Sequence, residues 1–73
     1  MIFIDLTPYR CPVPLVKLKM AVKAIGVGDS LHVQLSDSGS RQDVPAFFKN
    51  QGHSVEIIQD DENRLCVVIT KLR

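Results

Sequence analysis

The sequence predicts an α/β fold, a two-layer sandwich in which two helices lie on one face of a four-stranded mixed sheet, in the order β-α-β-α-β-β. Three observations predict it. Four short segments place apolar residues at the period of a strand. Two longer segments place them at the period of a helix or between helix start and stop signals. Each predicted helix connects one strand to the next, so both helices must share a sheet face to close a single core.

The N-terminal part is predicted to form one strand and one helix. Ile2, Ile4 and Leu6 alternate with other residues, as in a short strand. A helix is predicted from Pro14 to Ile25, and two glycines then end it. Its core-facing residues recur at helical spacing, and they are Leu15, Leu18, Ala21, Val22 and Ile25.

Three further strands are predicted. Leu31, Val33 and Leu35 alternate with polar residues, and the segments 55–59 and 64–71 have the same pattern. The sheet face turned away from the helices is expected to be comparatively open. It would carry Phe3, His32, Gln34, Cys66 and Val68.

The start of the second helix is ambiguous, although it should end before Gly52. Asp37 or Ser40 is a candidate cap, with Asp43 three residues after the serine. Pro45 lacks a backbone N–H and disfavours helical backbone at the residue before it. We therefore expect either a late start near Asp43 or an irregular first turn.

Length and composition indicate an ordinary soluble globular protein. The 73 residues suffice for one domain, 1–73, with a modest core. A net charge of +1 gives no electrostatic case for nucleic acid as the main ligand. No apolar run approaches the roughly 18 residues that span a bilayer, and the N-terminus does not resemble a secretory signal. We expect a cytoplasmic protein without a membrane partner.

Cysteine spacing argues against a structural metal. Cys11 and Cys66 form no CxxC pair, and the two histidines stand apart from both. We therefore expect two free thiols, no metal and no cofactor.

The segment Arg10-Cys11-Pro12-Val13-Pro14 indicates chemistry. We expect Cys11 to cap the first helix, with Pro12 and Pro14 as its first and third residues, where a backbone N–H needs no partner inside the helix. The N–H of Val13 is then the donor best placed for the sulfur. The positive end of the helix dipole and Arg10 both favour the thiolate, so the segment predicts a lowered pKa for Cys11.

A solitary sulfur favours a carrier over a catalyst. Carbonyl chemistry needs a base and an oxyanion hole, and a thiol oxidoreductase needs a resolving cysteine, at whose usual position Pro14 stands. The competing interpretation is that Cys11 is a core residue, as most cysteines of small domains are. Cys66, inside an apolar strand, fits that interpretation, and we expect it to be structural.

Several segments together resemble one known family. In chain order they are Arg10 to Leu15, Gly28-Asp29, Asp37, Asp43 to Phe47, and Gly52-His53. They resemble the TusA/SirA-like sulfur-carrier family over nearly the whole chain. The resemblance implies the same sandwich and a persulfide on Cys11, received from a cysteine desulfurase or a rhodanese-like donor and passed to a sulfur-acceptor protein. It leaves open whether such a sulfurtransferase-type carrier counts as an enzyme.

The sequence departs from the family pattern at three places, and the first two leave the partner and the pathway open. Val13 stands where an acid is common, and Ser36-Asp37-Ser38 replaces a usual Asp-Asp-Pro. Phe48 replaces a cysteine that many members carry, so Cys11 is the sole candidate thiol. The best-known role in the family leads to thiolation of tRNA, and other members look linked to sulfur oxidation, molybdenum cofactor or selenium metabolism.

The first helix also predicts a partner-binding surface. Val16 and Met20 lie one turn apart, opposite the core-facing stripe, and Lys17, Lys19 and Lys23 flank them. We expect the two apolar residues to form a contact spot and the lysines to attract an acidic partner. The alternative is that these are ordinary exposed side chains.

Two other functions compete with the carrier. One is a non-catalytic protein-binding or RNA-binding module, although near-neutral charge and four aromatic residues argue against RNA, so nucleic acid is expected only indirectly. The other is a haem sensor that uses the Cys-Pro dipeptide, for which no distal ligand lies near. The open sheet face could pair with a second copy, so we expect a monomer or a weak dimer.

Overall fold

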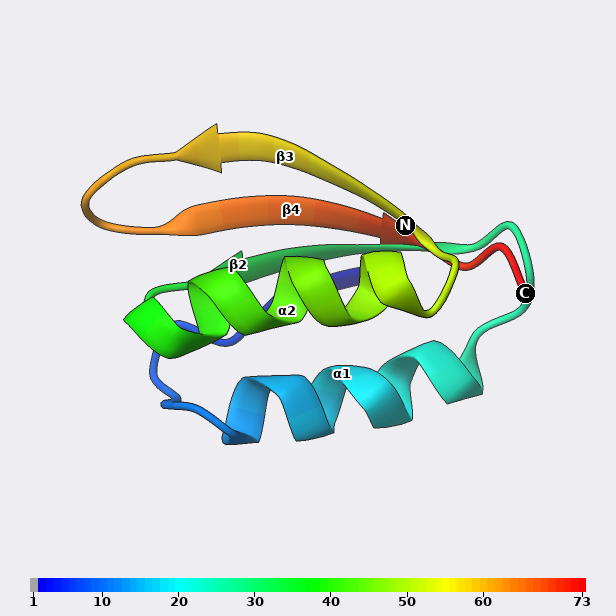
Figure 1. Cartoon of the computed structure of the whole chain (residues 1–73), viewed down its shortest axis with the longest axis horizontal. Helices are drawn as coiled ribbons and strands as arrows, with labels where there is room; N and C mark the ends of the chain where they lie inside the picture. Colours follow the sequence, from blue (N-terminus) through cyan, green and yellow to red (C-terminus); the bar gives the residue numbers. More distant parts are fainter. Residues whose placement is uncertain (1) are drawn as a thin grey trace.

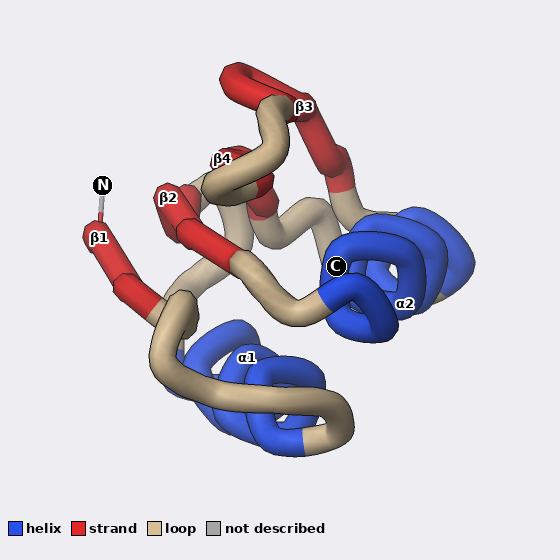
Figure 2. Tube along the Cα trace, turned by 90° about the vertical axis from the view of Figure 1, so that its left-hand side faces the viewer, coloured by secondary structure: helices blue, strands red, loops and turns tan. Residues whose placement is uncertain are grey.

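The computed structural model describes residues 2–73. Its six elements follow the predicted order: β1 (Ile2–Asp5), α1 (Val13–Ala24), β2 (Ser30–Leu35), α2 (Ser38–Asn50), β3 (Ser54–Asp60) and β4 (Leu65–Thr70). The strands lie in the sheet as β1-β2-β4-β3. The β1–β2 pair is parallel and the other two pairs are antiparallel. Both helices cover the same sheet face (Figure 1, Figure 2), so the predicted mixed-sheet sandwich is confirmed.

The hydrophobic core lies between the sheet and the two helices. The register of the central strands places apolar side chains opposite one another, because Leu31 pairs with Ile69 and Val33 with Val67. All four are fully buried. From α1, Leu18 and Val22 are buried in the same cluster, with Leu15, Ala21 and Ile25 packed against it. The predicted core-facing stripe of the first helix is therefore confirmed.

Helix α1 begins at Val13, one residue after the predicted first position at Pro12 and one before the predicted helical pattern from Pro14, and Pro12 occupies its cap position. Pro14 is consequently the second helical residue, and its side chain is buried. The N–H of Val13 donates to the carbonyl oxygen of Arg10 at 2.9 Å, so the predicted bond to the cysteine sulfur is wrong. Cys11 lies before the cap and not at it.

Helix α2 starts regularly at Ser38, which corrects the expectation of a late or irregular start. The Asp37 side chain caps the helix by accepting the N–H of Ser40 at 3.0 Å, and the N–H of Arg41 donates to the Asp37 carbonyl at 2.9 Å. Pro45 lies buried inside the helix. The cap therefore fixes the start of α2, while the proline removes only one interior hydrogen bond.

The open sheet face is confirmed in part. Phe3 is 58% exposed and meets the ring of His32 edge-on, with centroids 5.0 Å apart. Cys66, also predicted on this face, is only 4% exposed. It lies on β4 between cross-strand neighbours on both sides, Gln34 and Gln59, next to a bulge in β3. Cys66 is therefore covered by its neighbours within the sheet.

Across residues 2–73, neither helix combines the length and the apolar content that crossing a membrane requires.

Candidate functional site

Cys11 lies at the end of the molecule where both helices begin. It lies in the loop that connects β1 to the start of α1, and the first turn of α2 lies beside it (Figure 1). Its thiol is free and the residue is exposed. A Cβ atom added to Gly39 would lie 3.3 Å from the Cys11 Cβ atom and 3.7 Å from its sulfur. The close approach of α2 to the cysteine therefore depends on a residue without a side chain.

Asp37 ties the Cys11 loop to the start of α2. Its Oδ2 atom accepts the N–H of Cys11 at 3.1 Å, the N–H of Ser40 at 3.0 Å and the hydroxyl of Ser40 at 3.2 Å. The N–H bonds from Ser40 and Cys11, together with the charge of Arg10, hold the pKa of the Asp37 carboxyl below its usual value. One ionised carboxylate thus caps a helix and positions the cysteine backbone.

Asp43 faces the sulfur itself. The thiol of Cys11 donates to its Oδ2 atom, with 3.7 Å between sulfur and oxygen. Removal of water from the sulfur raises the pKa of Cys11, and the hydrogen bond to Asp43 and the negative charges of Asp43 and Asp37 raise it further. The predicted lowering of this pKa is therefore wrong. The sulfur lies against carboxylates and not against the helix N–H groups, and Arg10 acts on Asp37.

Asp37 and Asp43 are the residues of the site that the sequence interpretation missed. They lie 26 and 32 positions after Cys11. The available signal was that both fall in the segments that carry the family resemblance. Of the residues predicted to support the site, Arg10, Pro12 and Val13 are exposed around Cys11, whereas Pro14 belongs to the buried side of α1.

The predicted partner surface on α1 is exposed but divided. Val16 and Met20 are 50% and 68% exposed, as expected. The Lys17 ammonium lies 5.0 Å from the ring centre of Tyr9, on the side of the Cys11 loop. Lys19 lies 4.5 Å from the ring centre of Phe47 on α2. The lysines therefore point to different neighbours.

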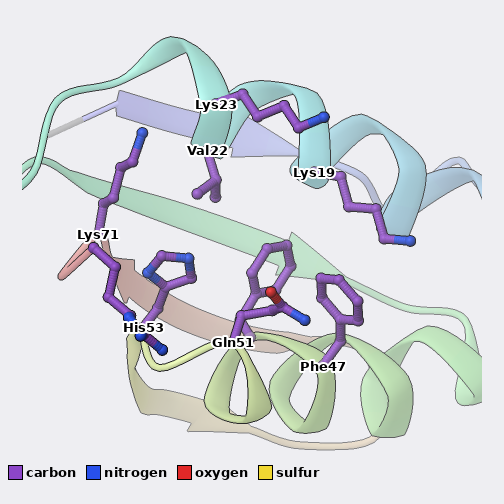
Figure 3. Close-up of a pocket in the computed structure, with 9 residues that line it drawn as sticks. Lys19, Val22, Lys23, Phe47, Gln51, His53 and Lys71 are labelled. Carbon is purple, nitrogen blue, oxygen red and sulfur yellow. The ribbon is translucent and has the colours of Figure 1, made fainter.

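Lys19 and Lys23 line a groove of about 430 Å³ between the two helices and the chain that follows β4 (Figure 3). Lys71 and Arg73 line it as well, together with His53, so the basic side chains come from three separate segments. Its apolar side chains are Val22, Phe47 and Phe48. No carboxylate side chain is among its lining residues in the described part of the chain. The groove is therefore a basic surface suited to an acidic group.

Within the described chain, residues 2–73, no three side chains of His, Cys, Asp or Glu come together in an arrangement that could hold a metal ion.

Comparison with known proteins gives one consistent result. Residues 2–71 match the family described as sulfurtransferase TusA. A putative sulfur carrier protein of Archaeoglobus fulgidus is 30% identical over the full length of both chains. The sulfur carrier protein TusA of Allochromatium vinosum is 29% identical over 93% of this chain and 90% of its own.

A solved structure agrees with the sequence matches. The crystal structure of a SirA-like protein from Desulfitobacterium hafniense superimposes with a TM-score of 0.84, covers both chains completely and is 27% identical. The predicted family resemblance and fold are thereby confirmed. The chain belongs to the TusA family of sulfurtransferases.

Proposed function

We propose that this protein is a sulfur carrier that holds a persulfide on Cys11 and passes it from a donor protein to an acceptor protein. The observation that supports the proposal most directly is the exposed, free thiol of Cys11 on a loop tied to α2 by Asp37. The names of the relatives point the same way, since they are sulfur carrier proteins.

The transfer step needs no oxidant. The deprotonated sulfur of Cys11 attacks the terminal sulfur of the donor's persulfide, a new S–S bond forms at Cys11, and the donor's S–S bond breaks. The donor leaves as a thiolate that takes up the proton given up by Cys11. Delivery repeats the exchange, with the acceptor's nucleophile attacking the terminal sulfur and Cys11 leaving.

The surroundings of Cys11 favour a carrier over a thiol oxidoreductase. The other cysteine, Cys66, is buried in the sheet and hydrogen-bonded towards Gln59. An intramolecular disulfide would therefore need Cys66 to leave its site. The donor we propose is a cysteine desulfurase or a rhodanese-like protein, and thiolation of tRNA is one of the sulfur pathways that such a carrier would serve.

The proposed function predicts that the protein takes up sulfur from a donor. The protein, incubated with a cysteine desulfurase and cysteine, is expected to gain the mass of one sulfur atom and to lose it on treatment with a reducing thiol. Intact-mass spectrometry measures the gain, and fragmentation should place it on the peptide that contains Cys11. A chain that takes up no sulfur from desulfurase or rhodanese-type donors would instead favour the alternative, a binding module without covalent chemistry.

We further propose that the sulfur-donor protein docks on the exposed face of α1 and on the basic groove beside it. Val16 and Met20 offer apolar contact, and Lys19 and Lys23 are joined in the groove by Lys71 and Arg73. Charge complementarity of this kind raises the association rate with an acidic partner and is weakened by salt.

Charge reversal on α1 tests this docking surface. The double variant Lys19→Glu, Lys23→Glu is expected to load sulfur about tenfold more slowly at low ionic strength, with the difference shrinking as salt is added. Initial loading rates at several salt concentrations measure the effect. The control is Lys49→Glu, Arg64→Glu, which changes the net charge equally at two exposed residues that do not line the groove. Equal slowing of both variants would contradict docking at this surface.

A further inference from the structure

The charged groups nearest to the sulfur of Cys11 are negative. Asp43 lies 3.7 Å from the sulfur, and Asp37 binds the backbone N–H of the same residue. Both carboxylates belong to α2 or its cap. The cation next to Cys11 in the chain, Arg10, acts on Asp37. A reactive cysteine usually lies in positive surroundings, so this arrangement needs a different explanation.

Asp43 is poorly suited to act as a base for Cys11. A carboxyl group ordinarily titrates about five pH units below a thiol, and a base so much weaker than the group it deprotonates contributes little. The consequence of its position is therefore electrostatic. Its Oδ2 atom accepts a hydrogen bond from the neutral thiol, and the same oxygen repels any form of Cys11 that carries negative charge.

We propose that Asp43 is a positioning residue that stabilises the empty, protonated form of Cys11 and destabilises the anionic persulfide, so that the carrier gives up its sulfur readily. This inference rests on the proposed sulfur-carrier function. A persulfide is more acidic than a thiol and is an anion at neutral pH, so loading replaces an S–H group that donates to Asp43 by a negative charge. The loss of that hydrogen bond and the new repulsion both favour transfer onwards.

The same contact predicts where the loaded sulfur points. The terminal sulfur carries the charge, and Asp43 and Asp37 both repel it on the side of α2. A single Cβ atom added to Gly39 of α2 would already lie 3.3 Å from the Cys11 Cβ atom and 3.7 Å from its sulfur, so little room remains on that side. The persulfide is therefore directed away from α2 and into solvent, where an acceptor can reach it.

The first test measures the titration of the thiol. In Asp43→Asn the midpoint of the pH profile for alkylation of Cys11 by iodoacetamide is expected to fall by about one pH unit, which makes alkylation near neutral pH up to about tenfold faster. Asp43→Glu keeps the charge and is expected to retain most of the wild-type midpoint. The matched control is Glu56→Gln, which removes one negative charge from an exposed residue on β3. An Asp43→Asn midpoint equal to that of Glu56→Gln would overturn the inference.

The second test measures sulfur retention. Loaded wild-type protein is mixed with an equal amount of isotopically labelled, empty Asp43→Asn protein, and the sulfur on each is read from intact masses at equilibrium. The persulfide is expected to accumulate several-fold on the variant, while a Glu56→Gln partner should share it equally. Equal sharing with Asp43→Asn would overturn the inference even if the midpoint shifts. Failure of the wild-type protein to load at all would instead reject the proposed function, and the alkylation midpoint separates the two cases.

Discussion

Replacement of Cys11 by serine is expected to abolish sulfur loading completely, whereas Cys66→Ser is expected to leave it intact. A serine hydroxyl cannot form the S–S bond that holds the transferred sulfur, and the chain has no third cysteine. Cys66 is only 4% exposed, so the persulfide of a donor protein cannot reach it in the folded chain. Intact-mass spectrometry after incubation with a cysteine desulfurase and cysteine measures both variants.

Cys66→Ser is the matched control, because it makes the same chemical change at the other cysteine. It places a hydroxyl in a buried position, which is expected to lower the free energy of unfolding by about 1–3 kcal/mol. Loading should therefore be compared at a temperature at which circular dichroism finds both variants folded. Sulfur uptake by Cys11→Ser would contradict the assignment of Cys11 as the carrier residue.

The fold could be predicted because the core pattern is local and regular. Leu31, Val33 and Leu35 alternate along one strand, and the sheet register places them on the buried face. The start of α2 is harder to predict from the sequence, because two local preferences compete there. Pro45 argued for a late start, whereas the Asp37 cap, which holds Ser40, determines the real one.

The working residue of the site could also be proposed from sequence, but its electrostatics could not. The expected lowering of the Cys11 pKa relied on neighbours in the chain, namely Arg10 and the start of α1. The groups that act on the sulfur, Asp43 and Asp37, come from the second helix and its cap. Their approach depends on how closely α2 packs on the loop at Gly39, which is a tertiary property.

The basic groove could not be predicted from the sequence for the same reason. Lys19 and Lys23 were identified on α1 from their helical spacing. Lys71 and Arg73 follow the last strand and carry no periodic signal that would connect them to α1. The structure joins the two segments, and Lys71 also donates to the carbonyl of Ile25 at the end of α1, at 2.8 Å.

Truncation of Phe48 is expected to destabilise the fold more than any substitution at the Cys11 site. Phe48 is 1% exposed and is the largest fully buried side chain. Phe48→Ala should therefore cost about 3–5 kcal/mol. A protein of 73 residues has a total stability of about 4–11 kcal/mol, so the variant is expected to be partly unfolded near physiological temperature. Urea denaturation, followed by circular dichroism, measures the difference.

Phe47→Ala is the natural control, because it removes the same ring from the adjacent residue of α2. Phe47 is only partly buried and holds Lys19 over its face, so its loss should cost about 1–2 kcal/mol. Equal losses for the two variants would show that Phe48 is not a core residue. The contrast also bears on the cysteine that the family resemblance leads one to expect at position 48. That position is nine residues beyond Gly39, which adjoins Cys11, or about 13 Å along the helix axis. A thiol there would be buried and distant from Cys11, so Phe48 supports the fold without removing a resolving partner.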